Sequence, residues 1–437
     1  MRVMKWSIIA LAVAAGTSQM AFASSQSESK GFVEDSSLNV KTRMLYFSRD
    51  PRNSTAPTDG SPRRSEETGL GFLGTYESGF TQGAVGFGVD AIGMLGIKLD
   101  SGKGRTGTGQ FPTGSDGRSE DSFSEGGGAV KMRISDTVLK YGTQFTALPV
   151  LATDDSRLLP ETIEGFLLTS KEINGLELNA GHFTALNAQS QSYHDSIGGK
   201  DRQTGIKGPG LTSADVLGGS YSFTDNLSTS LYYSKVEDYW RKYYANVNWA
   251  LPINDDQGLV FDVNFYDTKS DGAALYTAYD GDKLDNQAFS LSAAYNIGAH
   301  TFTLAHQRVT GEGDYGYGID GGGTIFLANS VARSDFNAED ERSWQARYDL
   351  NMASYGVPGL SFMTRYVTGE GANVEGTTNG KEWERDIEAK YVLQEGPAKD
   401  LSFRVRQATY RSADGVYYGS PSLDELRLIV EYPLSIL

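Results

Sequence analysis

The chain has 437 residues and a formal net charge of −16, with 52 glycines, 24 tyrosines, 20 phenylalanines and no cysteine. The absence of cysteine excludes disulfides and thiolate metal sites, and the acidic balance argues against nucleic acid as a partner. No apolar run reaches the roughly 18–20 residues that a membrane-spanning helix needs, which excludes a helical membrane protein.

The N-terminus has the pattern of an export signal. Arg2 and Lys5 precede a short apolar stretch at residues 6–15, and Ala-Phe-Ala at residues 21–23 forms a cleavage site. We therefore predict a signal peptide over residues 1–23 and one mature domain over residues 24–437. Loss of the two basic residues would lower the net charge from −16 to −18.

The mature sequence repeats segments of about ten residues in which apolar and polar side chains alternate. In residues 38–47, LNVKTRMLYF, the apolar side chains lie opposite Lys41 and Arg43. A period of two indicates β-strands rather than amphipathic helices. The same alternation recurs at residues 129–134, 344–350, 401–406 and 425–434.

The connections between these segments come in two sizes. Eight are short turns rich in Gly, Asn, Asp and Pro, such as Asn174-Gly175 and Gly396-Pro397. The connections on the other side comprise a tight reversal at residues 237–239 and eight long polar loops, at residues 50–68, 101–125, 143–163, 184–215, 267–286, 311–341, 369–384 and 412–424. This asymmetry predicts an all-β fold: an 18-stranded antiparallel transmembrane β-barrel with short periplasmic turns, long extracellular loops and both termini in the periplasm.

Two further features fit a barrel. Residues 144–166, around the third long loop, are more apolar than the other loops. We predict that this loop folds inward, because an 18-stranded barrel is wide and needs a constriction to be selective. Aromatic residues near the strand ends predict interfacial girdles, and they are Tyr46, Trp240, Tyr243, Tyr244, Trp249, Tyr391 and Tyr432.

If the apolar faces meet lipid, the alternation places a set of cations on the lumen side. Guanidinium groups in a constriction could guide carboxylates, with bidentate contacts available at each step. The alternative is that each cation only pairs with a lumen carboxylate and stiffens the wall. The inward cations are Lys41, Arg43, Arg49, Lys131, Arg133, Arg347, Lys390, Arg404, Arg406 and Arg427.

Other motifs do not support catalysis. Two Gly-x-Gly-x-x-Gly patterns, at residues 69–74 and 316–321, lack the strand–turn–helix context of a dinucleotide site. The four histidines lack metal spacing, and no local motif supplies a nucleophile–base pair. We therefore expect no enzyme activity, no cofactor and no metal site, although calcium binding by the acidic residues 280–285 stays open.

Nine stretches of the chain carry a family resemblance, and they are GFVEDSSL, TYESGFTQG, VGFGVDA, GGAVK, SRLLP, IFLANSV, SWQARYDLN, ASYGVPGL and GPAKDLSFR. These stretches are similar to the porin D (OprD-type) family of outer-membrane carboxylate channels. The resemblance implies a pore in the bacterial outer membrane, in contact with lipid and lipopolysaccharide, that is monomeric or packed as a loose homotrimer. The resemblance implies passive uptake of small carboxylate solutes. The chain looks most similar to the basic-amino-acid branch of the family, which takes basic amino acids, short peptides and carbapenem-type antibiotics.

The same resemblance implies roles for individual residues. The acidic side of the selectivity region matches Asp335, and a loop aromatic matches Tyr315. The family pattern carries an acid where Gly323 stands, and Asp320 is close enough in sequence to replace it. The basic ladder of the family matches Arg49, Arg157, Lys390, Arg404, Arg406 and Arg427.

Two other functions stay open from the sequence. One is a channel of the same fold that selects aromatic or other simple carboxylic acids. The other is a plugged surface barrel that acts as an adhesin. The inward cations favour a channel, because a plugged barrel has no need of a cationic track through its lumen.

Overall fold

The structure is a computed structural model that describes residues 26–52, 64–192, 210–277, 281–374, 377–412, 416 and 422–437. The predicted signal peptide lies outside these residues, so it stays a prediction. Within the described residues, no helix is long and apolar enough to cross a membrane.

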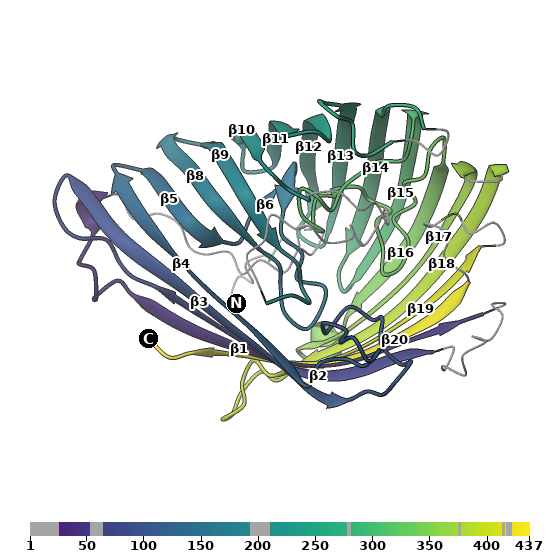
Figure 1. Ribbon diagram of the computed structural model, residues 1–437, viewed down its shortest axis with the longest axis horizontal. Coiled ribbons are helices and arrows are strands. Elements are labelled where there is room, and N and C mark those ends of the chain that lie inside the picture. Colours follow the sequence, from purple (N-terminus) through teal and green to yellow (C-terminus); the bar gives the residue numbers. More distant parts are fainter. Residues whose placement is uncertain are drawn as a thin grey trace.

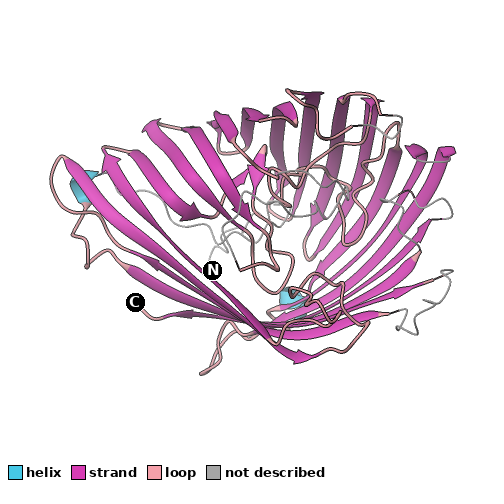
Figure 2. Cartoon of the chain, in the orientation of Figure 1, coloured by secondary structure: helices cyan, strands magenta, loops and turns pink. Residues whose placement is uncertain are grey.

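Eighteen antiparallel strands pair in chain order into one sheet, and β1 also pairs with β20, which closes the barrel (Figures 1 and 2). The predicted fold is therefore confirmed. Four further elements do not belong to the barrel sheet. They are a two-stranded ribbon, β6 (Ala147–Leu148) and β7 (Leu151–Ala152), and two short 3-10 helices, η1 (Gln26–Glu28) and η2 (Met352–Tyr355). The barrel strands are β1 (Ser37–Pro51), β2 (Ser65–Glu77), β3 (Val85–Asp100), β4 (Ser122–Ile134), β5 (Thr137–Gln144), β8 (Thr162–Ile173), β9 (Leu176–Asn187), β10 (Ala214–Thr224), β11 (Leu227–Val236), β12 (Trp240–Asn254), β13 (Gln257–Ser270), β14 (Asp285–Ile297), β15 (His300–Glu312), β16 (Arg342–Asn351), β17 (Leu360–Val374), β18 (Thr377–Val392), β19 (Ser402–Ser412) and β20 (Leu423–Ser435).

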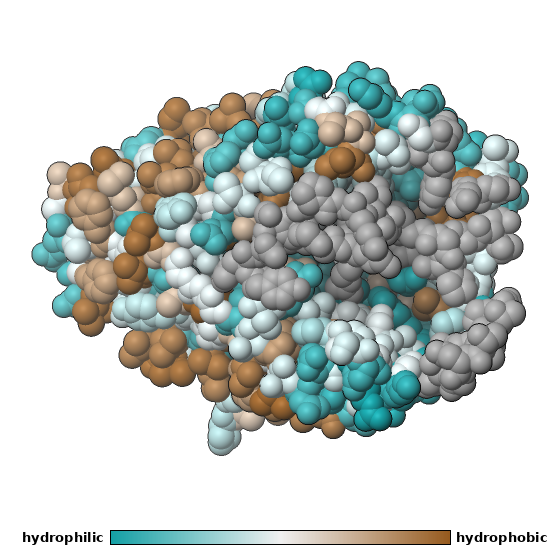
Figure 3. All heavy atoms as spheres, viewed as in Figure 1, coloured by the Kyte–Doolittle hydropathy of each residue, from teal (hydrophilic) through white to brown (hydrophobic). Residues whose placement is uncertain are grey.

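The alternation of side chains decides which face of each strand points into the barrel. In β20, Arg427 is 4% exposed and Leu428 is 37% exposed. In β4, Lys131 is 9% exposed and its neighbour Val130 is 58% exposed. Figure 3 shows apolar residues gathered along the outer flank, at the left and lower edges of the view. Charged side chains thus face inward and apolar side chains face outward, as a barrel in lipid requires.

One predicted loop is wrong. Residues 369–384 are not a long loop, because β17 and β18 continue to Val374 and Thr377 and pair through this segment. Gly371, with φ +83°, sits at an irregularity between Glu370 and Ala372 where the pairing register shifts. A glycine in a strand can mark a β-bulge as well as a turn, so the glycines of this segment gave a misleading loop signal.

Two aromatic residues predicted for the girdles are wrong as well. Trp240 is 0% exposed and Tyr244 is 5% exposed, because the alternation in β12 directs both side chains inward. Their neighbour Tyr243 points outward and is 55% exposed, and Trp249 and Tyr391 are also exposed on the outer surface. The girdle prediction therefore holds for these last three and fails for residues on the opposite face of the same strand.

The hydrophobic core lies inside the barrel and is built largely from two loops. L3, residues 145–161, connects β5 to β8, and L7, residues 313–341, connects β15 to β16. Val150 of L3 and Tyr315 of L7 are fully buried in one cluster with wall residues such as Tyr266. Figure 1 shows β6 of L3 inside the ring of strands. The inward fold of the third loop is confirmed, and L7 joins it inside the barrel.

The topology predicts which residues an external reagent can reach. Ala273 lies in the β13–β14 connection on the long-loop side, and Asp225 lies in the short β10–β11 turn on the other side. Both residues are exposed and the chain contains no cysteine, so single-cysteine variants label cleanly. A membrane-impermeant maleimide should label Ala273→Cys on intact cells and Asp225→Cys only after permeabilisation. Equal labelling of both on intact cells would contradict the topology.

Candidate functional site

Glycines in β2 allow L3 to lie directly against the barrel wall. A Cβ atom at Gly69 would stand 2.6 Å from Leu158 Cδ2 and 2.7 Å from Phe111 Cζ, and one at Gly71 would stand 2.9 Å from the Leu158 carbonyl oxygen. These distances are too short for a real Cβ contact. Two glycines of the first Gly-x-Gly-x-x-Gly pattern therefore make room for a loop and not for a nucleotide.

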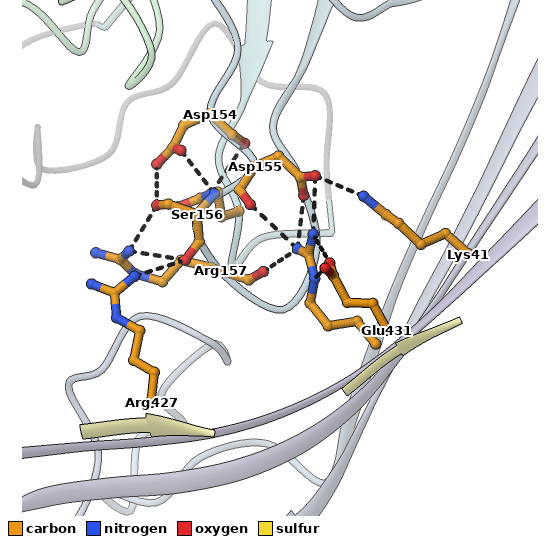
Figure 4. A network of polar contacts seen from close by, with 9 residues as sticks. Lys41, Asp154, Asp155, Ser156, Arg157, Arg427 and Glu431 are labelled. Atoms are coloured by element: carbon orange, nitrogen blue, oxygen red, sulfur yellow. Dashed lines mark hydrogen bonds and ion pairs between the residues drawn. The ribbon is translucent and has the colours of Figure 1, made fainter. Parts of the chain in front are cut away.

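Asp155 ties L3 to the barrel wall through ion pairs. Its carboxylate lies 2.7 Å from Lys41 Nζ and 2.8 Å from an Arg43 guanidinium nitrogen, and Arg43 also binds Glu431 of β20. Figure 4 shows residues 154–157 held between these contacts and Arg427. Burial alone would raise the pKa of Asp155, but Arg43 and Lys41 hold it below the usual value. L3 therefore stays fixed by charge at neutral pH.

Three arginines surround one buried phenylalanine next to L3. The guanidinium carbons of Arg427, Arg49 and Arg157 lie 4.3, 4.7 and 5.3 Å from the centre of the Phe47 ring. Glu425 binds Arg427 at 2.6 Å and Arg49 at 2.9 Å. The aromatic face and one carboxylate together hold three like charges close together, which otherwise repel each other.

A more exposed group of cations lies next to this cluster on β18 and β19. Arg404 and Arg406 both approach Glu388, at 3.7 and 2.6 Å, and their side chains are 25% and 24% exposed. Lys390 is the register partner of Arg404 and forms no ion pair with any described residue. Since inward residues in a strand lie two positions apart, successive levels of cations are separated by about 6.6–6.8 Å.

The structure separates the remaining predicted cations from this group. Lys131 binds Asp90 at 2.6 Å. Arg133 donates to the Gln26 side chain at 2.9 Å, near the turn that leads to β5. Arg347 binds Asp349 at 2.7 Å. The structure thus brings together Arg49, Arg157 and Arg427 around Phe47. Arg404, Arg406 and Lys390 lie beside this cluster, and Lys41 and Arg43 lie at Asp155. Three predicted cations lie apart from these groups: Lys131, Arg133 and Arg347.

Asp320 lies in a buried ion pair. Its carboxylate and the Lys242 side chain are both 0% exposed, and Lys242 Nζ lies 2.6 Å from Asp320 Oδ2. Lys242 Nζ also lies 4.5 Å from the Trp240 ring centre and 4.8 Å from that of Tyr315. Asp320 therefore fastens L7 to β12 and has no side-chain surface that a solute could reach in this structure.

The other two predicted L7 residues are also buried. Asp335 is 6% exposed and accepts hydrogen bonds from the hydroxyl groups of Tyr317 and Ser330. Tyr315 is 0% exposed and its hydroxyl donates to the Thr324 carbonyl oxygen at 2.8 Å. Both residues hold the shape of L7, and Asp335 keeps a small exposed surface.

The position of Gly323 explains why this chain lacks the expected acid there. A Cβ atom at Gly323 would lie 2.9 Å from the Thr153 carbonyl oxygen and 3.1 Å from that of Ala152. The Gly323 amide donates to the Ala152 carbonyl oxygen at 3.0 Å. L7 thus packs flush on L3, and a larger residue at this position would push the two loops apart.

Comparison with known proteins assigns the chain and its fold to one family. Residues 30–436 match the model of the outer membrane porin, OprD family. This chain belongs to the OprD family. It is 50% identical to Porin D of Pseudomonas aeruginosa over an alignment of 464 residues that covers all of both chains.

Solved structures of Pseudomonas aeruginosa proteins agree with this assignment. The crystal structure of the outer membrane protein OprD has a TM-score of 0.78 and 45% identity, with 95% of this chain and 98% of that chain covered. OpdK, solved with vanillate, has a TM-score of 0.81 and 33% identity, with coverage of 93% and 100%. This OprD-family chain is therefore an outer-membrane porin for small solutes, a passive channel and not an enzyme.

Sequence reasoning missed several partners of the basic residues in this OprD-family site. Glu425 and Glu388 lie on the inner faces of β20 and β18, so the period-two pattern could have found them beside the arginines. Lys242 also lies on an inward face, but its partner is 78 residues away in a loop. Phe47 carries no chemical signal of its own, since an inward aromatic residue is usually part of a core.

Proposed function

We propose that this porin selects small carboxylate-bearing solutes for passive uptake, most of all basic amino acids and short peptides, and carbapenem-type antibiotics with them. The observation that carries the proposal is the partly exposed pair Arg404 and Arg406, which shares a single carboxylate, Glu388. Because two guanidinium groups share one resident acid, some of their N–H groups remain free to donate hydrogen bonds to the carboxylate of a solute. Lys390, beside Arg404, adds a further positive charge.

The arrangement of acids among the cations supports passage rather than trapping. Glu425, Glu388 and Glu431 each accept from ladder or neighbouring cations, so a solute carboxylate competes with a resident carboxylate at every level. Conduction needs binding that is favourable enough for entry and weak enough for release. With about 6.6–6.8 Å between levels, a carboxylate can contact the next cation before it leaves the previous one.

The ladder is tested by uptake into proteoliposomes. The double variant Arg404→Gln, Arg406→Gln should lower uptake of both arginine and benzoate at least about tenfold, since the loss of even one charge-assisted hydrogen bond costs roughly 1.5 kcal/mol. Glutamine keeps a hydrogen bond to Glu388, so folding should survive. The matched control is Lys235→Gln, which removes a 44% exposed cation on the outer face. Unchanged uptake in the double variant would leave these arginines a wall-stiffening role.

Preference for basic amino acids requires a second contact, because a cationic pore alone repels their ammonium and guanidinium groups. We assign that contact to the carboxyl group of Asp335 on L7, which is 6% exposed. Asp335→Asn should raise the half-saturating concentration for arginine by about tenfold and spare benzoate. Ser330→Ala is the control, because it removes one hydrogen bond to Asp335 and keeps the carboxyl group itself. If arginine and benzoate fall together in Asp335→Asn, Asp335 does not set selectivity.

A channel for aromatic or other simple carboxylic acids is the second candidate. It is favoured by the burial of the two candidate acids, since Asp320 is 0% and Asp335 6% exposed. It is also favoured by the relative OpdK, solved with vanillate, an aromatic carboxylate. Faster uptake of benzoate than of arginine by the unmodified protein would decide for this candidate.

We further propose that each chain forms a complete pore. The pairing of β1 with β20 closes the wall without a second chain. A loose homotrimer of such barrels is compatible with this arrangement and would conduct through each barrel separately.

A further inference from the structure

A row of charged residues crosses the outer face of the barrel near its extracellular end. Cα pairing places Arg308 of β15 opposite Arg342 of β16, Arg342 opposite Glu370 of β17, and Glu370 opposite Lys381 of β18. All four residues are exposed. Arg342 is the first residue of β16, directly after L7, so the row lies on the extracellular side. Like charges directly opposite one another destabilise a strand pair, so the Arg308–Arg342 pair is unfavourable by itself.

The acids on this face do not balance the cations. Glu370 binds Arg342 at 2.9 Å, and Arg342 remains 56% exposed. Arg308 has no hydrogen bond or ion pair within the described part of the chain. Two further arginines lie on the outer faces of β18 and β19. Arg385 donates to the Thr409 hydroxyl at 3.4 Å and forms no ion pair with a described residue, and Arg411 binds Asp424 at 2.7 Å.

A second outer row shows the arrangement that a balanced surface takes. On the strands that precede β14 in the sheet, Lys235, Arg241 and Lys269 are aligned in register across β11, β12 and β13. Asp271 lies 3.3 Å from Lys235 and 3.2 Å from Arg241, and Asp285 lies 3.2 Å from Lys269. The excess of cations on β15–β19 is thus specific to one flank of a chain whose net charge is −16.

Aromatic residues mark the depth of this flank in the membrane. Trp344, two residues after Arg342, is 59% exposed. Trp383 stacks on Tyr366 with ring centres 5.6 Å apart, and Leu304, four residues before Arg308, is 65% exposed. Exposed tryptophan and tyrosine side chains settle at the boundary between hydrocarbon and headgroups. The arginines beside them therefore lie at the level of the lipid headgroups.

We propose that the outward-facing cations of β15–β19 bind the phosphate groups of an anionic glycolipid in the outer leaflet. Charge complementarity selects this occupant, because the surplus is positive and exposed and faces lipid rather than the lumen. Guanidinium groups bind phosphate oxygens in bidentate geometry, and a phosphate between Arg308 and Arg342 would relieve their mutual repulsion. The cationic surface consists of Arg308, Arg342, Lys381, Arg385 and Arg411, with Glu370, Asp424 and the exposed Glu312 of β15 as its acids.

The test measures binding of lipid A to the full-length protein in neutral detergent by native mass spectrometry. Bisphosphorylated lipid A should bind, and lipid A without phosphates should not. Each basic residue near an anionic lipid contributes about fivefold to affinity, so Arg308→Gln with Arg342→Gln should weaken binding by about 25-fold. The matched pair Lys235→Gln with Arg241→Gln on the balanced flank should leave affinity within about twofold.

A variant that is expected to strengthen lipid A binding separates loss of the binding site from misfolding of the protein. Glu370→Gln removes an acid from the same row and should tighten binding severalfold. Equal binding of the phosphate-free lipid, equal loss in the Lys235/Arg241 pair, or weaker binding in Glu370→Gln would each overturn the proposal. Lipid binding is read without any transport step, so this result is independent of the solute preference proposed above.

Discussion

Replacement of Lys242 by methionine is expected to detach L7 from the barrel wall. Lys242 and Asp320 are both 0% exposed and lie 2.6 Å apart, so the variant leaves a buried carboxylate without its counter-charge. Removal of one partner from a buried ion pair costs about 3–5 kcal/mol. The strand pairing around residue 242 uses backbone groups and stays intact, so this cost falls on the contact between L7 and β12.

Single-channel recording measures this detachment. Lys242→Met should convert a steady current into one with frequent opening steps, because L7 no longer stays packed in the lumen. The double variant Lys242→Met, Asp320→Asn should recover most of the steady behaviour, since it removes the unpaired charge as well. A single variant with wild-type current traces, or a double variant as noisy as the single one, would show that the ion pair does not hold L7.

The barrel and its basic lining could be predicted because they depend on a local rule. A period of two assigns Arg404, Arg406 and Arg427 to the same face, and any sheet that buries the other face in lipid must direct them inward. The same rule, applied strictly, would have placed Trp240 inside, since it alternates with Tyr243 and shares a face with Lys242. Trp240 was wrongly assigned to the girdle because its position near a strand end was considered without the face of the strand on which it lies.

The loop contacts could not be predicted, because they join residues distant in sequence through packing. L7 reads as a polar, glycine-rich loop, yet Tyr315, Ile319 and Leu327 fill the hydrophobic cluster with L3. Nothing local to Asp320 signals a lysine 78 residues earlier. Glycine is ambiguous in the same way: Gly71 provides space for L3, whereas Gly371 marks an irregularity in a strand pair.

A cluster of buried carboxyl groups forms a second attachment of L7. Glu341 of L7 is 0% exposed and lies against Gly369, where a Cβ atom would overlap it. Glu382 of β18 accepts from the Ser334 hydroxyl at 2.5 Å, and Glu384 accepts from the Ser334 amide at 2.8 Å. The other charged groups nearby are Asp314, Asp335 and Glu339 of L7, and Asp386 of β18 with its partner Arg365 of β17. So many acids beside so few cations are stable only if some of them are protonated.

The docked state of L7 therefore binds protons that the released state loses. Burial, with a contribution from Glu382, raises the pKa of Glu341 well above its usual range. Burial, with Glu339 and Glu382 adding to it, raises the pKa of Asp314 from 3.8 to about 7. Because these acids have raised pKa values in the folded state, their support for docking is complete below about pH 4. For Asp314 that support is lost as the pH rises through about 7, and for Glu341 it is lost as the pH rises through its raised pKa.

We expect L7 to open more often as the pH rises from 5.5 to 8.5. Each proton that docking retains shifts the equilibrium by up to about tenfold per pH unit within this window. Single-channel recording at constant salt measures the opening frequency. Glu341→Gln should reduce the slope of the profile, because glutamine keeps a neutral group beside Glu382 at every pH while Asp314 still titrates. Glu395→Gln, which removes an exposed acid in the β18–β19 turn at the opposite end of the barrel, should leave the profile unchanged. A flat wild-type profile, or an equal slope in Glu341→Gln, would show that the carboxyl cluster does not control L7.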